Sequence, residues 1–339
     1  MNFFYYDFEK NVYHTQLDAV ASSKHCWFYF FDKEMASVPW KIEPSQTLDQ
    51  LYKARAEYIR DTYKYVILCY SGGHDSTNIL ETFYYNNIHI DEILVVGALS
   101  QDSFKGSDEN HNGELYKNVF PTLSKLNLPN TKITVVDYTT WFNDPNNFTT
   151  IQQYGNEWTK QIGGFRSVHT LFWRDLKKFI GHSNSKETAY IMGTDKVNLA
   201  YEPDQPSFVR FNDLSFLDYG SNYEDENFKR VNFYSDAHST ATDITRKQAH
   251  IVNKFKKLNL ETGRPWADVL NKLLYDLRHP LVYMSPKSIY TSISARDMFM
   301  LNAKNSEMYS MFAEGINTIT KYGSAKEKYH FWTRSYYIE

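Results

Sequence analysis

The alternation of short apolar runs with amphipathic segments is the feature that most limits how this chain can fold. Between residues 65 and 193, apolar β-prone runs recur, and segments with apolar residues at helical spacing separate them. Such alternation indicates βαβ units, which build a parallel sheet. The predicted strands cover 65–70, 92–97, 132–137 and 189–193, and the predicted helices between them cover 77–86, 113–126 and 170–180. We therefore expect an α/β fold with a doubly wound parallel sheet.

The segments around this alternating region give weaker signals. A helix is predicted over 47–62, ahead of the first strand. The polar stretch 139–164 predicts a surface loop, because its Asn-Asp-Pro-Asn-Asn cluster at 143–147 can continue neither a helix nor a central strand. After about residue 201 the alternation fades, and the predicted elements are a hairpin at 208–216 and helices at 244–258 and 266–277. The aromatic segment 233–236 is typical of a core, although it also suits the substrate side.

These signals divide the chain of 339 residues into three regions. Residues 1–60 are expected to form an N-terminal extension that packs on the core, 61–200 the α/β domain, and 201–339 a mainly helical region. Because 42% of the residues are hydrophobic and 23% are charged, the composition is that of an ordinary globular protein. The 37 basic and 40 acidic residues give a net charge of −3, which disfavours nucleic-acid binding without a local basic patch.

Membrane, disulfide and metal-cluster classes are disfavoured by the same sequence. The N-terminal residues lack the features of a signal peptide, and no apolar run is long enough to cross a bilayer, so we expect a cytoplasmic protein without a membrane partner. The two cysteines, Cys26 and Cys69, cannot form a four-cysteine site within one chain. The histidines show no metal-ligand spacing and are expected to be core or surface residues: His111, His238, His250 and His279.

A glycine-serine turn between the first predicted strand and its helix carries the chemistry. Its two glycines allow the backbone to approach an anion closely, and the following helix N-terminus directs amide groups toward the same place. The serine hydroxyls add donors, and the aspartate suits a Mg²⁺ ion that bridges phosphates. The Walker pattern with its lysine is absent. The predicted phosphate-binding residues are Ser71, Gly72, Gly73, His74, Asp75 and Ser76.

In this strand-turn-helix context, the sequence Ser-Gly-Gly-x-Asp-Ser resembles the PP-loop of the ATP pyrophosphatases, the adenine-nucleotide α-hydrolase-like superfamily. The resemblance covers residues 65–201. Members include asparagine synthetase, GMP synthetase, NAD synthetase, tRNA-lysidine synthetase and the phosphoadenosine-phosphosulfate reductases. The resemblance implies ATP and Mg²⁺ as cofactors, with the loop around the β- and γ-phosphates. It also implies that a substrate oxygen attacks the α-phosphorus, pyrophosphate leaves, and a nucleophile then displaces AMP.

Three further positions acquire expected roles from this resemblance. After the fourth predicted strand, Asp195 is a candidate second Mg²⁺ ligand beside Asp75, and Lys196 is a candidate to neutralise pyrophosphate. An ordinary polar loop is the alternative interpretation of that segment. Gly97, after the second strand, resembles the turn on which the family places adenine.

Arg166 follows a glycine pair and precedes a predicted helix. A cation in such a setting can be presented to a substrate carboxylate or phosphate. A solvated helix start explains the same residues equally well.

The missing cysteines narrow the choice within the superfamily. Enzymes that insert sulfur into tRNA and the deazapurine nitrile synthase need cysteine pairs or a four-cysteine zinc site, and the reductases need a cysteine near the C-terminus. The residue after Met1 is not the cysteine that begins a glutaminase domain. The remaining class is an ATP-dependent adenylating synthetase that uses ammonia or an amine. Within the superfamily, the chain is most similar to the synthetase domain of asparagine synthetase and to stand-alone bacteriophage-encoded members.

Two alternatives stay open. One is a nucleotide, DNA-base or tRNA modification enzyme of the same superfamily. The other is a nucleotide-binding module without catalysis. In each case the partners are ATP and a small-molecule or nucleotide acceptor, with the region 201–339 on the substrate side.

Overall fold

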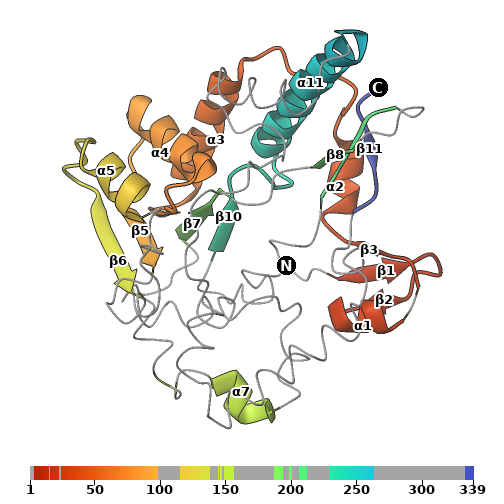
Figure 1. The fold of residues 1–339 in the computed structure, drawn as a ribbon, viewed down its shortest axis with the longest axis horizontal. Helices are drawn as coiled ribbons and strands as arrows, with labels where there is room; N and C mark the ends of the chain where they lie inside the picture. Colours follow the sequence, from red (N-terminus) through yellow and green to blue (C-terminus); the bar gives the residue numbers. More distant parts are fainter. Residues whose placement is uncertain are drawn as a thin grey trace.

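The computed structural model describes residues 4–14, 16–22, 24–97, 115–137, 144, 146, 149–155, 187–193, 198–200, 206–211, 229–262 and 333–339. In these residues the chain forms a central parallel sheet, two small antiparallel sheets and the helices around them (Figure 1). None of the helices in these ranges combines the length and the hydropathy that a membrane span requires.

The central sheet has five strands in the order β10-β7-β4-β5-β6, and every neighbouring pair is parallel. From the middle strand β4 the chain builds outward through β5 and β6, and it then returns to the other side of β4 to add β7 and β10. This two-way order confirms the expected α/β fold. The strands are β4 (Tyr65–Cys69), β5 (Glu92–Gly97), β6 (Lys132–Asp137), β7 (Thr188–Met192) and β10 (Lys229–Asn232).

Four of these strands lie where the apolar runs predicted them, within one residue at each end. The sequence analysis did not predict β10, because Lys-Arg-Val-Asn contains a single apolar residue, Val231. Among the described residues, β10 is an edge strand of the sheet and pairs with β7. The sheet therefore extends past residue 200, and the strand-helix alternation continues through β10 into α11 (Ser239–Thr262).

Helix α3 (Leu48–Thr62) begins at a capping box, in which the Thr47 hydroxyl accepts from the Gln50 amide at 3.3 Å and the Gln50 side chain accepts from the Thr47 amide at 3.0 Å. Helix α4 (His74–Tyr85) begins three residues before the predicted start at Thr77. Residues 74–76 are polar and add nothing to the apolar periodicity, so the sequence pattern shows only the later turns of this helix.

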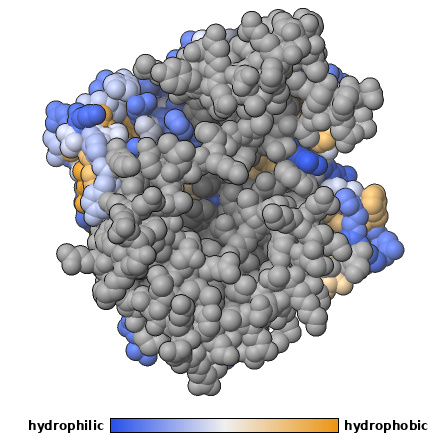
Figure 2. Space-filling view, in the orientation of Figure 1, coloured by the Kyte–Doolittle hydropathy of each residue, from blue (hydrophilic) through white to orange (hydrophobic). Residues whose placement is uncertain are grey.

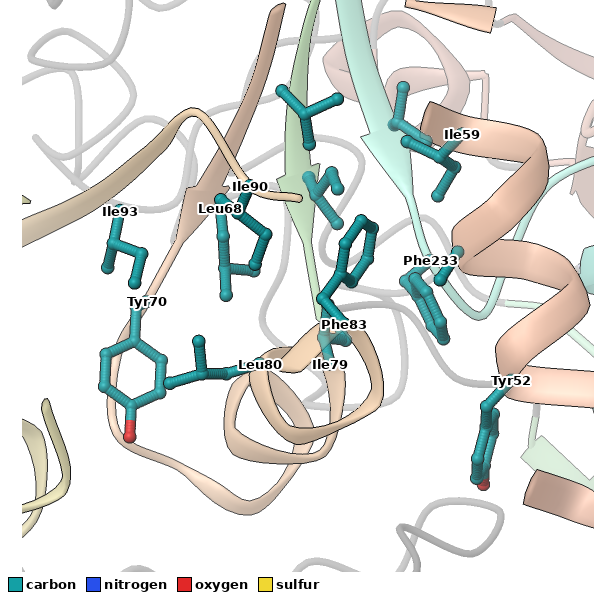
Figure 3. Packing of buried hydrophobic residues seen from close by; sticks show 14 of the residues in the cluster. Tyr52, Ile59, Leu68, Tyr70, Ile79, Leu80, Phe83, Ile90, Ile93 and Phe233 are labelled. Atoms are coloured by element: carbon teal, nitrogen blue, oxygen red, sulfur yellow. The ribbon is translucent and has the colours of Figure 1, made fainter. Parts of the chain in front are cut away.

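The main core lies between one face of the sheet and helices α3 and α4 (Figure 3). Alternate strand residues such as Leu68 and Ile93 point toward this layer, where they meet Ile59 of α3 and Leu80 and Phe83 of α4. All five side chains are fully buried. Burial of an aliphatic or aromatic side chain of this size contributes about 1.5–3 kcal/mol, so this layer fixes the position of the loop between β4 and α4.

The segment 113–126 was expected to be one helix, and the structure corrects this expectation. Within the described residues it consists of a π-helical turn, η2 (Leu115–Val119), followed by the short helix α5 (Phe120–Leu123). Pro121 in the first turn of α5 has no amide hydrogen to donate, so a regular α-helical ladder cannot run through this position.

The stretch 139–164 was expected to be a loop, but it contains α7 (Thr149–Tyr154). These six residues follow the Asn-Pro cluster and include no glycine or proline, so nothing in them prevents a helical turn. The predicted helices at 170–180 and 266–277 lie outside the described residues.

Strand β6 forms the other edge of the sheet. Its residues Ile133 and Val135 are 46% and 41% exposed. Hydrophobic residues accordingly reach the surface along the side of the molecule where β6 lies (Figure 2).

The N-terminal residues form a second sheet, with the order β2-β1-β3 and antiparallel pairing. In a third sheet, with the order β11-β9-β8, β9 pairs antiparallel with the preceding strand β8 and with β11, which is far away in the sequence. Of the hairpin expected at 208–216, residues 212–216 lie outside the described residues. A shared hydrophobic cluster includes Phe28, Trp40, Phe211 and Ile338. The elements are β1 (Tyr5–Asp7), β2 (Val12–Tyr13), α1 (Gln16–Ala21), β3 (Cys26–Phe28), α2 (Asp32–Ser37), β8 (Asn198–Ala200), β9 (Phe208–Arg210) and β11 (Tyr336–Tyr337).

Arg55 of α3 holds the connection between β10 and α11 in place. Its guanidinium is fully buried and donates to the carbonyls of Asn232 at 2.9 Å and Phe233 at 3.2 Å and to the Asp236 carboxylate at 2.8 Å. A buried charge is stable only when its hydrogen bonds are satisfied. These three partners therefore tie α3 to the end of the parallel sheet.

Arg55→Met is expected to lower the free energy of unfolding by about 2–4 kcal/mol, because it leaves two buried carbonyls without a donor and a carboxylate without its cation. Urea denaturation followed by circular dichroism measures this change. Lys53→Met is the control on the same helix, since the Lys53–Glu57 pair is half-exposed and such pairs contribute at most about 1 kcal/mol. Equal losses in the two variants would contradict the role given to Arg55.

Candidate nucleotide-binding site

The loop between β4 and α4 lies at the point where the direction of sheet building reverses. β4 and β7 are hydrogen-bonded neighbours. The next strands of the sheet are added at opposite edges of this pair, with β5 beside β4 and β10 beside β7. In open α/β sheets, ligands bind in the crevice outside the carboxyl ends of the strands at such a switch point. The motif found in the sequence therefore occupies the position that the topology itself favours for a ligand.

Two glycines give the loop its shape. Gly72 has a φ of +76°, and a Cβ atom there would lie 2.6 Å from Cγ2 of Val119, so both the backbone and the neighbouring π-turn require glycine. Gly73 is the N-cap of α4, with an extended backbone and no side chain to accept a hydrogen bond. Because the first amides of a helix have no partner within the helix, this uncapped end of α4 presents donors to an anion.

The two serines of the motif contact each other across the loop. Their hydroxyl oxygens are 3.2 Å apart, and the Ser71 amide donates to the Ser76 hydroxyl at 3.3 Å. Ser76 is 4% exposed and donates to the Gly73 carbonyl at 3.2 Å, whereas Ser71 is exposed. Ser76 therefore closes the loop from inside, and Ser71 is the hydroxyl that faces solvent.

His74 and Asp75 occupy the first turn of α4. His74 is exposed, and Asp75 is half-buried. A carboxylate in this position is stabilised by the positive end of the helix dipole. Mg²⁺ in nucleotide sites is held by one or two carboxylates together with phosphate oxygens, so Asp75 is of the right chemical type and in the right place to share such an ion with a phosphate.

The chain that leaves β7 passes directly against the start of α4. A Cβ atom on Gly193 would lie 3.1 Å from both the Cβ of Asp75 and the amide nitrogen of Ser76. A larger residue would press on the first turn of the helix, which explains the glycine in physical terms. The structure thus brings the motif at 71–76 and the end of β7 together, as the sequence argument assumed. Asp195, Lys196 and Arg166 lie outside the described residues.

Gly97 at the end of β5 is packed against the π-turn. A Cβ atom there would lie 2.3 Å from Cδ1 of Leu115, whose side chain is 6% exposed. Leu115 therefore packs closely against Gly97. The assignment of Gly97 to the adenine side of the site stays a prediction.

Cys69, the last residue of β4, lies two positions before the loop. Burial raises the pKa of its thiol to about 12. The thiol therefore stays protonated at neutral pH and is not a nucleophile there. In the ranges that the structure describes, no three His, Cys, Asp or Glu side chains gather as a metal site.

Sequence reasoning missed one contact with the loop. The hydroxyl of Tyr234, which follows β10, donates to the Asp75 carbonyl at 3.0 Å. The aromatic segment 233–236 was assigned to the core or to the substrate side, and Tyr234 is indeed 1% exposed. No local pattern signals a hydrogen bond between residues 159 positions apart.

Comparison with known proteins adds little to this description. No protein-family profile matches the chain, and no curated protein matches it. Among solved structures, an NH3-dependent NAD synthetase from Campylobacter jejuni, in complex with the nitrate ion, aligns with 81% of this chain and 96% of its own length, with 12% sequence identity and a TM-score of 0.29.

Proposed function

We propose that this chain is an ATP-dependent, AMP-forming enzyme whose nucleotide site is the loop at residues 71–76. The observation that supports the proposal is the position of a glycine-serine loop and an uncapped helix N-terminus at the switch point of a parallel sheet. The resemblance of that loop to a PP-loop supplies the reaction class.

In this proposal the amides at the start of α4 and the Ser71 hydroxyl bind the β- and γ-phosphates. Asp75 and Asp195 would hold Mg²⁺, which neutralises phosphate charge when it is bound. Lys196 counters the charge of the leaving pyrophosphate, and Arg166 binds a carboxylate or phosphate of the acceptor.

The proposed reaction has two steps. An acceptor oxygen attacks the α-phosphorus of ATP, the bond to the β-phosphate oxygen breaks, and pyrophosphate leaves with that electron pair. Ammonia or an amine then attacks the activated carbon of the acceptor, and AMP leaves. The finer proposal is an asparagine-synthetase-like amidation without a glutaminase domain, with a small carboxylate or a nucleotide as the acceptor.

The nucleotide product tests this proposal. The protein, Mg²⁺ and ammonia are incubated with ATP labelled at the α- or γ-position, across a panel of carboxylates, nucleotides and tRNA. We expect AMP from the α-label and pyrophosphate from the γ-label in equal amounts with at least one acceptor, because the loop lacks the Walker lysine. ADP as the product would contradict adenylation, and ATP binding without turnover on any acceptor would favour a non-catalytic module.

A further inference from the structure

Tyr234 connects the end of the parallel sheet to the first turn of α4. Its hydroxyl donates to the main-chain carbonyl of Asp75 at 3.0 Å. The same hydroxyl accepts from the side-chain amide of Asn78, one turn further along α4, also at 3.0 Å. Because Asn78 occupies a lone pair of the oxygen, the hydroxyl hydrogen is directed at the Asp75 carbonyl.

Tyr234 itself is firmly held. Its ring packs edge-on against Phe233, with centroids 5.1 Å apart, and against Tyr52, at 6.1 Å. Its carbonyl accepts from the Thr245 hydroxyl of α11 at 2.9 Å. Arg55 donates to the two preceding carbonyls. The hydroxyl is therefore placed by three elements of the core, α3, β10 and α11.

The first turn of α4 needs such an external contact. Helix ends fray unless a side chain caps them, and Gly73 supplies no cap. The turn is instead held from two sides, by the hydroxyl of Tyr234 and by Gly193 at the end of β7. Both contacts fall on the main chain of Asp75 or its neighbour Ser76, so they fix the amides and the carboxylate of this turn.

We propose that Tyr234 is a positioning residue of the nucleotide site: its hydroxyl holds Asp75 and the first amides of α4 in the orientation that binds Mg²⁺ and the phosphates of ATP. This inference rests on the proposed function. Preorganised donors bind an anion without a cost of ordering at the moment of binding.

Tyr234→Phe tests the inference, because it removes the hydroxyl and keeps the ring. We expect the Kd for Mg-ATP, measured by equilibrium dialysis, to rise about tenfold. Hydrogen exchange of the amides at 77–79, which donate to the carbonyls of the first turn, is expected to become at least about tenfold faster, while exchange in α3 stays unchanged. The exchange measurement uses the protein without ATP. If Tyr234 acted only through the packing of its ring, the exchange rates would stay unchanged, because phenylalanine keeps that ring.

Tyr65→Phe is the matched control. The Tyr65 hydroxyl donates to the Glu92 carboxylate at 3.0 Å, at the end of β4 opposite to the loop. The control loses a tyrosine hydroxyl and its hydrogen bond, but not the bond to the Asp75 carbonyl. We expect its Kd for Mg-ATP and its exchange at 77–79 to stay within about twofold of the wild-type values.

The outcomes separate the two proposals. If the wild-type protein binds Mg-ATP and Tyr234→Phe binds it equally well, the positioning role is wrong and the nucleotide site stands. If the wild-type protein does not bind ATP, the proposed function fails and the positioning role falls with it. Should Tyr234→Phe not fold, Asn78→Ala tests the same network by removing the donor that orients the hydroxyl, and unchanged ATP affinity there would overturn the role.

Discussion

Gly73→Val is expected to abolish nucleotide binding in a protein that still folds. The backbone of Gly73 has φ −73° and ψ 166°, a conformation that valine adopts without strain. A branched side chain at the N-cap stands beside the first amides of α4 and blocks the close approach of a phosphate. We expect the Kd for Mg-ATP to rise about 100-fold or more, which corresponds to about 2.7 kcal/mol. Equilibrium dialysis with labelled ATP measures the loss.

The control for this prediction is Thr47→Val, which places the same side chain at the N-cap of α3. It breaks a capping box and costs about 1 kcal/mol of stability, but it lies outside the loop and is expected to bind ATP normally. Gly72 is a poorer choice for the test, because its positive φ and its contact with Val119 make any substitution there a folding defect. Unchanged ATP affinity in folded Gly73→Val protein would remove the loop from the site.

Apolar runs in the sequence predicted four strands of the central sheet. The polar strand β10 and the very short outer strands were missed. β4, β5, β6 and β7 each contain consecutive apolar residues, so periodicity alone located them. β10 consists mostly of polar residues and lies at an edge, where one strand partner suffices. The strands of the outer sheets are two or three residues long, and β9 pairs with β11, which is far away in the sequence. Such pairing is decided by tertiary packing and leaves no local pattern.

The residues of the candidate site also differ in how well the sequence predicts them. The glycines and serines at 71–76 form a local turn, and their order in the sequence was enough to locate an anion site. The contacts that fix this turn come from elsewhere in the chain: Gly193 lies at the end of β7, and Tyr234 lies in the segment that follows β10. The prediction that the segment after the fourth strand lies beside the motif requires β4 and β7 to be neighbours, and the strand pairing confirms that they are. Tyr234 had no signal beyond an aromatic segment typical of a core.

Asp75→Asn is expected to lower AMP formation by about 10²-fold or more and to reduce the gain in ATP affinity that Mg²⁺ provides. Asparagine has the same shape but lacks the charge that holds a cation. The fold is expected to persist, because the bond from Tyr234 ends on the main-chain carbonyl of Asp75, which the substitution keeps. Initial rates of AMP formation and Kd values for ATP, each measured across Mg²⁺ concentrations, give the two quantities.

Asp49→Asn is the matched control, since Asp49 is the acidic residue in the first turn of α3. Both substitutions remove a carboxylate that interacts with a helix dipole, at a cost of about 0.3–1 kcal/mol, but only Asp75 lies in the loop. A general loss of helix stability would therefore affect the two variants alike, whereas a metal role predicts lost turnover in Asp75→Asn alone. If Asp75→Asn keeps the wild-type rate and Mg²⁺ dependence, the cation is held by other groups, and the site reduces to the glycines and amides of the loop.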